Sequence, residues 1–175
     1  MDNLQGYNTT QLLVQYSIAF YLRSKVTDHS LLAELPETYQ IPRRNPTDLQ
    51  SLIAKLCIDT KDQNNEFFEM IPTKLAPVLT EERFKSTFLS IAKQMINEEG
   101  LNWGRIISLF TFAGVLSQFF IENKQPLLVV EISTLLTDFI NENENIMPWI
   151  ISNGGWNTVY DMVYQIFRNI IHPKK

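Results

Sequence analysis

The chain of 175 residues has 15 Lys and Arg against 19 Asp and Glu, a formal net charge of −4. This acidic balance argues against a nucleic-acid partner, because phosphate binding is driven by an excess of basic side chains. Hydrophobic residues at 45% and charged residues at 19% predict a single folded domain with a large core, residues 1–175. The single cysteine, Cys57, cannot form an internal disulfide and indicates a reducing compartment.

The first part of the chain predicts one helix followed by a loop. Helical periodicity runs from end to end, and no sustained alternation of polar and apolar residues predicts strands. The first helix is expected to follow Asn8-Thr9-Thr10, whose side-chain oxygens suit an N-cap. Residues 28–46 are interpreted as a loop, because Pro42 and Pro46 disfavour helix near its end.

A second helix is predicted to begin near Thr47. Thr47 and Gln50 have the spacing of a capping box, in which each residue satisfies a backbone N–H of the other. The pattern weakens between residues 60 and 78. There we expect only a short turn of helix, its end bracketed by Pro72 and Pro77.

The second half of the chain predicts the core. Thr80 is a candidate N-cap for a helix that stops at Gly100. Two consecutive helices follow, 102–122 and 126–141, and both are apolar on nearly all sides, so other helices must surround them. Two shorter helices, separated at Gly154-Gly155, complete an all-α bundle of about eight helices, with a central apolar hairpin wrapped by amphipathic helices.

Neither a membrane span nor an active site is predicted. The apolar segments 106–121 and 126–140 are shorter than the ~20 residues that cross a bilayer and contain polar residues, so we interpret them as core helices. The final segment, 163–175, is too short and too polar to anchor the chain, and any anchor is expected to be absent from this sequence. His29 and His172 have no spaced metal-ligating partners, and no glycine-rich phosphate loop is present, so we expect no enzyme, metal or cofactor.

Two short blocks carry a resemblance. Asn102-Trp103-Gly104-Arg105-Ile106, followed by Phe110, Phe112 and Gly114, resembles the first homology motif of the Bcl-2 family. Pro148-Trp149-Ile150 with Asn153-Gly154-Gly155-Trp156 resembles the second, and one helix separates the two, as in that family. The opening helix, QLLVQYSIAFYL, is similar to the family's N-terminal helix by its hydrophobic pattern alone.

The resemblance implies an apolar surface groove that receives an amphipathic BH-3 helix from a partner. Gly104 lacks a Cβ and would let the partner's backbone approach closely. Arg105 can donate paired hydrogen bonds to an aspartate of that helix, beside Asn102, which caps its own helix. By position, the candidates for the groove lining are Leu89, Ala92, Ile96, Ile107, Ser108 and Phe112.

Structural interpretations of the same residues stay open. Arg105 could be a surface cation packed on Trp103, and Gly104 could serve helix packing alone. Ile107 and Phe112 could point into the core. The three tryptophans, Trp103, Trp149 and Trp156, are expected in the core rather than in a contact surface.

The chain's own BH-3 equivalent indicates which class of family member this is. It falls near Leu56–Asp62, where Thr60 replaces the small Gly of the family's Leu-x-x-x-Gly-Asp pattern and Lys61 replaces the acid. A pore-forming death effector exposes this helix to a partner's groove, so the degraded pattern favours a pro-survival member. Ser108, where Ala is common, and Asn157, where Asp often follows the Trp, are milder departures.

The predicted function is inhibition of apoptosis by sequestering the BH-3 helices of pro-apoptotic relatives. The resemblance places the protein in the cytoplasm, at the mitochondrial outer membrane, and both a virus-encoded mimic and a divergent animal protein fit. Two alternatives remain: a pro-apoptotic pore-forming effector, and a Bcl-2-like fold with a closed groove that inhibits a different signalling pathway.

Overall fold

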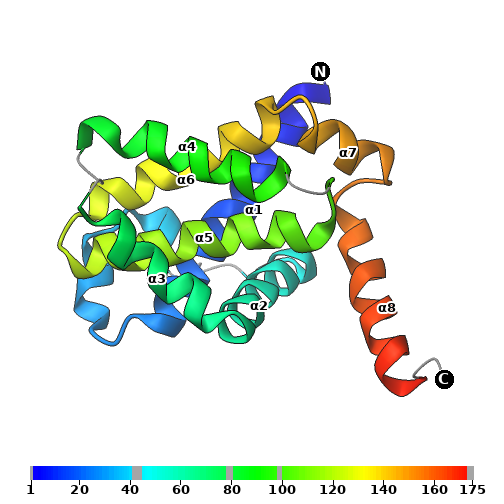
Figure 1. Cartoon of the computed structure of the whole chain (residues 1–175), viewed down its shortest axis with the longest axis horizontal. Coiled ribbons are helices and arrows are strands. Elements are labelled where there is room, and N and C mark those ends of the chain that lie inside the picture. Colours follow the sequence, from blue (N-terminus) through cyan, green and yellow to red (C-terminus); the bar gives the residue numbers. More distant parts are fainter. Residues whose placement is uncertain (1, 41–44, 78–80, 98–99, 173–175) are drawn as a thin grey trace.

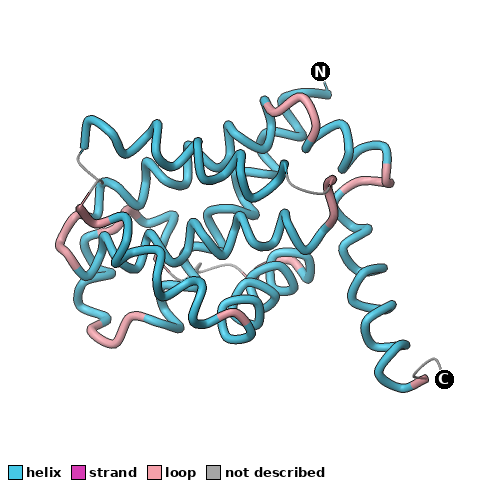
Figure 2. Tube along the Cα trace, viewed as in Figure 1, coloured by secondary structure: helices cyan, strands magenta, loops and turns pink. Residues whose placement is uncertain are grey.

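Helix α5 (Trp103–Glu122) runs through the middle of the molecule, and most of the other helices pack around it (Figure 1). The computed structural model describes residues 2–40, 45–77, 81–97 and 100–172. Within these residues all regular secondary structure is helical (Figure 2), which confirms the predicted all-α bundle of about eight helices. The remaining helices are α1 (Asp2–Lys25), α2 (Asp48–Gln63), α3 (Asn65–Leu75), α4 (Glu81–Asn97), α6 (Pro126–Glu142), α7 (Ile146–Ser152) and α8 (Val159–Ile171), with 3-10 helices η1 (His29–Glu34), η2 (Glu37–Tyr39) and η3 (Trp156–Thr158).

The core is built around α5, which contacts α1, α2, α3, α4 and α6. Among the described residues, α5 is the helix with the length and hydropathy needed to cross a membrane, but 72% of its most apolar window is buried inside the bundle. α6 packs along α5 as the predicted hairpin, yet it exposes a stripe that includes Leu127, Glu131 and Thr134. Other helices therefore surround α5, whereas one side of α6 is exposed to solvent.

The start of the first helix differs from the prediction. α1 begins at Asp2, so Asn8-Thr9-Thr10 lies inside the helix and the N-cap predicted there is wrong. The Thr10 hydroxyl donates to the Gly6 carbonyl at 3.2 Å and to Asn141 Oδ1 at 2.9 Å. Because these acceptors satisfy the hydroxyl within the helix, Thr10 does not need to end it.

The capping box at the start of α2 is confirmed. Gln50 N–H donates to Thr47 Oγ1 at 3.2 Å, and Thr47 N–H donates to Gln50 Oε1 at 2.9 Å. The predicted loop before it contains η1 and η2, which bury Leu32 and Tyr39 against the core. This connection therefore packs on the bundle. Pro42 and the predicted cap at Thr80 lie outside the described residues.

The region between residues 60 and 78 is more helical than predicted. α3 extends over three turns and contains Pro72, which was expected to mark its end. Proline removes one backbone N–H but leaves its carbonyl as an acceptor. Ala76 N–H donates to the Pro72 carbonyl at 2.8 Å, so the helical turn closes beyond the proline.

Candidate functional site

The two sequence blocks meet in space through their tryptophans. The ring centroid of Trp103 lies 5.3 Å from that of Trp149 and 5.7 Å from that of Trp156. Trp103 and Trp156 are buried, as predicted, whereas Trp149 is half-buried. The chain reverses between them at Gly154 and Gly155, whose φ angles of +103° and +90° favour glycine. These contacts hold the beginning of α5 against the end of α7.

The beginning of α5 is capped and open to solvent. Asn102 Oδ1 accepts a hydrogen bond from Arg105 N–H at 2.9 Å, which confirms the predicted cap. Gly104 is exposed, and a Cβ built there would meet, among the described residues, only Asn102 Oδ1, at 3.2 Å. Since no described side chain of another helix lies within 4 Å of that position, Gly104 makes no tight helix–helix contact that a Cβ would break.

Arg105 is half-buried and turned towards α4. Its Nη1 donates to the Met95 carbonyl at 3.4 Å, near the C-terminal end of that helix. The guanidinium is therefore held beside α4 rather than directed into bulk solvent. This hydrogen bond places the Arg105 side chain next to Met95.

An apolar cleft of about 380 Å³ lies between α3 and α4, and we call it the α3–α4 cleft. Two of its side chains, Phe67 and Met70, are about half exposed, at 52% and 46%. Met95 lines the cleft and also supplies the carbonyl that holds Arg105, so the cation lies next to a lining residue, although Arg105 is not itself part of the lining. The lining consists of Phe67, Met70, Ile71, Lys74 and Leu75 from α3, and Ile91, Gln94 and Met95 from α4.

The predicted site residues fall into two groups. Asn102, Gly104, Arg105 and Ser108 lie together at the start of α5, where the Ser108 hydroxyl donates to the Gly104 carbonyl at 2.9 Å. The other predicted residues do not line the α3–α4 cleft: Ala92, Ile96, Ile107 and Phe112 are buried in the bundle core, at 4% exposure or less, and Leu89 lines a different cleft.

Phe112 shows why these side chains face inward. Its ring stacks on Phe88 at 5.3 Å, and Phe88 in turn lies against Phe84 of the same helix. This aromatic cluster joins α4 to α5, so Phe112 belongs to the bundle core, as the alternative interpretation allowed. A partner helix would reach it only if α4 moved away.

The α3 wall of the cleft is not among the predicted site residues, and the predicted α4 residues Leu89, Ala92 and Ile96 lie on other sides of that helix. Successive residues are rotated by about 100° around a helix, so Ile91 and Met95 face α3 while Ala92 and Ile96 face the core. A signal for α3 was present: Phe67, Met70, Ile71 and Lys74 have the i, i+3, i+4, i+7 spacing of one helical face.

A second, larger cleft of about 550 Å³ lies between α4 and α6, and charged and polar residues line it together with Leu89, Leu135 and Phe139. Lys85 and Lys93 come from α4, and Asp138 and Glu142 from α6. Asp138 already accepts a hydrogen bond from the Tyr7 hydroxyl at 2.8 Å, and this bond raises the pKa of Tyr7. Because its walls are charged, this cleft suits an apolar helix face less well than the α3–α4 cleft does.

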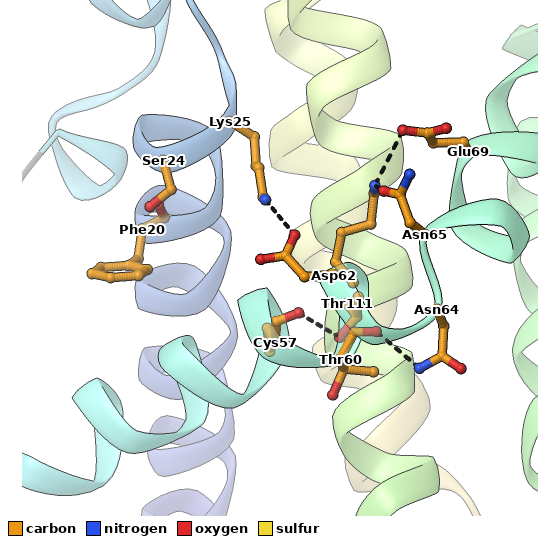
Figure 3. A network of polar contacts seen from close by, with 11 residues as sticks. Phe20, Ser24, Lys25, Cys57, Thr60, Asp62, Asn64, Asn65, Glu69 and Thr111 are labelled. Carbon is orange, nitrogen blue, oxygen red and sulfur yellow. Dashed lines mark hydrogen bonds and ion pairs between the residues drawn. The ribbon is translucent and has the colours of Figure 1, made fainter.

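Polar contacts hold helix α2, on which the resemblance places the BH-3 equivalent, on both sides (Figure 3). Asp62 accepts a hydrogen bond from Lys25 of α1 at 2.7 Å, which lowers the pKa of the Asp62 carboxyl. Lys61 is only 8% exposed; its Nζ donates to Asn65 Oδ1 and lies 3.7 Å from Glu69 of α3. The position of the family motif's acid is thus occupied by a buried cation directed at α3.

Comparisons with known proteins concern the family and the fold of the chain. A sequence model described as "Apoptosis regulator proteins, Bcl-2 family" matches residues 38–156. Bcl-2-like protein 1 of Rattus norvegicus is 36% identical over 73 residues, which cover 40% of this chain and 30% of that protein. Apoptosis regulator BAX of Rattus norvegicus is 31% identical over 159 residues, covering 87% of this chain and 78% of BAX. The crystal structure of chicken BOK superposes with a TM-score of 0.69 at 20% identity, covering 91% of this chain and 97% of that one.

Proposed function

The chain belongs to the Bcl-2 family of apoptosis regulators, which are not enzymes, and we propose that it inhibits apoptosis by sequestering the BH-3 helices of pro-apoptotic relatives in the α3–α4 cleft. The observation that supports this proposal is the hydrogen bond from Arg105 to the Met95 carbonyl, because it holds a cation beside a residue that lines an apolar cleft. The proposed place of action is the cytoplasm, at the mitochondrial outer membrane.

The cleft fits one face of an amphipathic helix. Apolar side chains of the partner, three or four residues apart, would pack between Phe67 and Met70 on one wall and Ile91 and Met95 on the other. Buried apolar area would supply most of the binding energy, at about 25 cal/mol per Å² before ordering costs are subtracted. An aspartate of the partner would accept hydrogen bonds from Arg105 and set the register. The flexible methionines allow the cleft to adapt to different partner side chains.

The matched relatives include both Bcl-2 and BAX, so they do not indicate whether this chain inhibits or promotes apoptosis. Helix α2 favours inhibition. A helix that enters such a cleft must offer an acid to the arginine beside it. α2 would offer Lys61 instead, and two cations would then face each other. Because Lys61 is also buried against α3, α2 is a poor ligand for another copy, and the chain is better suited to receive a helix than to donate one.

Calorimetric titration with a BH-3 peptide tests the site. Arg105→Ala should weaken binding by about 2–5 kcal/mol if the pair with the peptide's aspartate is desolvated. Arg23→Ala, on the exposed end of α1, makes the same substitution outside the cleft and should leave the affinity unchanged. Unchanged affinity for Arg105→Ala would remove Arg105 from the site.

A second pair of variants tests access to the cleft. Gly104→Glu should block binding of the peptide while the helical circular dichroism is retained, since the position is exposed. Leu127→Glu, on α6 and 82% exposed, is the matched control. If Gly104→Glu unfolds the domain, Ile91→Glu in the cleft wall replaces it. The purified protein should also leave dye-loaded liposomes intact when BH-3 peptide is added; peptide-induced leakage would favour the effector alternative.

A further inference from the structure

Helix α8 stands apart from the bundle and exposes a row of large apolar side chains. Figure 1 shows α8 projecting away from the other helices, and among the described elements only η3, directly before it, makes substantial contact with it. Its N-terminal end is fixed, because Trp156 and Val159 are buried in the core. Beyond that end most side chains of α8 face solvent, so its apolar row is a candidate contact surface.

Four of the exposed side chains form a continuous row along α8, which we call the α8 seam. Their spacings of four, three and four residues keep them on one face of the helix, as in the seam of a coiled coil. A row with this spacing is suited to pack on a matching row of another helix. The α8 seam consists of Tyr160, Tyr164, Phe167 and Ile171, whose exposed fractions are 38%, 65%, 62% and 56%.

The two sides of the α8 seam differ in chemistry. On one side lie Asp161, near the N-terminal end of α8, and Arg168, two turns further along the helix. In the described part of the chain neither of them forms an ion pair. On the other side lie Val163 and Ile170, which have the same spacing of seven residues. The acid and the base are therefore placed to pair with groups outside this chain.

We propose that the α8 seam packs on the α8 seam of a second copy of this chain, with the two helices antiparallel. Tyr160 of each copy then meets Ile171 of the other, and Tyr164 of each copy meets Phe167 of the other. A two-fold axis repeats every contact, so a single register pairs the whole seam. The contact uses none of the residues that line the α3–α4 cleft, and it stands independently of the proposed function.

The charges of α8 favour this orientation and this partner. In the antiparallel register Asp161 of each copy lies beside Arg168 of the other, and the two-fold axis makes two such pairs. In a parallel pair the acid and the base would be about 10 Å apart along the helix axis and would not meet. Exposed ion pairs add little affinity but select the orientation. Since one acid and one base leave α8 without net charge, it lacks the basic excess that anionic lipid headgroups attract.

The exposed apolar area is large enough for a weak dimer. A large apolar side chain that is about half exposed leaves on the order of 100 Å² accessible, so the α8 seam and Ile170, which is 71% exposed, give about 500 Å² per copy. The total of about 1,000 Å² is at the lower limit of specific interfaces. Because association and side-chain ordering offset much of this burial, we expect a Kd on the order of 1–100 μM.

Sedimentation velocity of the full chain, from about 1 to 300 μM, tests the dimer. The wild-type protein should change from monomer to dimer over this range. Phe167→Glu places a charge in the α8 seam and should weaken dimerisation at least about tenfold. Asn169→Glu adds the same charge near the same end of α8 but on the opposite face, and should change dimerisation by less than about threefold.

Exchanged charges test the antiparallel register. Asp161→Arg and Arg168→Asp each put like charges side by side in the homodimer and should weaken it about three- to tenfold. In an equimolar mixture, both arginines of one variant face both aspartates of the other, so the mixture should dimerise within about threefold of wild type. Neither a parallel pair nor a seam covered by another molecule predicts this recovery.

The outcomes separate the dimer from other occupants of the α8 seam. A wild-type protein that stays monomeric at the highest concentration overturns the dimer, as does equal dimerisation of Phe167→Glu and Asn169→Glu. A mixture that does not recover, or single charge variants that dimerise like wild type, overturns the antiparallel register. If the protein is monomeric and Phe167→Glu tightens BH-3 peptide binding, α8 covers its own cleft; if the monomer pellets with phosphatidylcholine–phosphatidylserine vesicles, lipid covers the seam. A dimer that binds no BH-3 peptide overturns the proposed function alone.

Discussion

At Gly114, α5 packs closely against Tyr21 of α1, and replacing this glycine with alanine tests the packing of the core. A Cβ built there would lie 2.7 Å from Tyr21 Cγ and 2.9 Å and 3.0 Å from the adjoining ring carbons. These atoms are at the root of the ring, and Tyr21 is 1% exposed, so the ring cannot swing out into solvent. Either the ring or the helix must move.

Two opposed effects determine how much Gly114→Ala changes the free energy of unfolding. Overpacking of this kind costs about 2–3 kcal/mol, whereas replacing a mid-helix glycine with alanine gains about 1 kcal/mol. Gly114→Ala should therefore lower the free energy of unfolding by about 1–2 kcal/mol and the Tm by about 2–8 °C. Gly6→Ala in α1, where a Cβ meets nothing within 4 Å among the described residues, should instead be stabilising, by up to about 1 kcal/mol.

Urea denaturation of four proteins measures the effect: wild type, Gly114→Ala, Tyr21→Leu and the double variant. In the Tyr21→Leu background the clash is relieved, so Gly114→Ala should become neutral or stabilising, and the coupling between the two sites should exceed about 1 kcal/mol. The reasoning is refuted if Gly114→Ala is as stable as wild type in both backgrounds.

Three further outcomes are expected. In urea denaturation, Lys61→Met should leave the free energy of unfolding within about 1 kcal/mol of wild type. Lys61→Asp, which puts an acid beside Glu69, should lower it by about 2–4 kcal/mol. Equal stability of the two variants would contradict the contact with α3. Asn102→Ala should cost about 0.5–2 kcal/mol by removing the cap of α5, and Asn102→Asp, which keeps an acceptor oxygen, should cost less. Burial raises the thiol pKa of Cys57 to about 12. A thiol reagent at pH 8 should therefore react about a thousandfold more slowly with the native protein than with the urea-unfolded protein. Equal rates would show that α2 opens readily.

The sequence predicted best where a single local pattern decides the structure. α5 and α6 follow from long apolar runs, and the start of α2 follows from the reciprocal hydrogen bonds of Thr47 and Gln50. Errors arose where a distant residue decides. Threonine is a common N-cap residue, but the Thr10 hydroxyl finds its acceptors inside the bundle, one of them on Asn141, 131 residues away. Proline often marks the end of a helix, but α3 continues past Pro72 because the helix packs on α5.

In the candidate site, the polar residues could be predicted from the sequence but the apolar lining could not, because distant packing decides the lining. Asn102, Gly104 and Arg105 are recognised by their chemistry, because capping, close approach and a fixed cation each need a particular residue type. An apolar lining has no such requirement, so Ile91 and Ala92 are equally plausible from the sequence. Only the packing of Phe88 and Phe112 in the core decides which side of α4 remains for the cleft.

One substitution links the stability of this bundle to its proposed role. By the resemblance, Lys61 stands where the family motif has an acid, so at this position α2 would lack the group that an arginine of a partner binds. Its buried ammonium contacts Asn65 and Glu69 on α3, the helix whose Phe67, Met70 and Ile71 form a wall of the cleft. A contact that supports one side of α3 also steadies the other, because a helix of this length moves as a unit. Under the proposed function, the lysine that would make α2 a poor ligand would also help to keep the cleft in shape for a partner helix, and Lys61→Asp should weaken BH-3 peptide binding along with the fold.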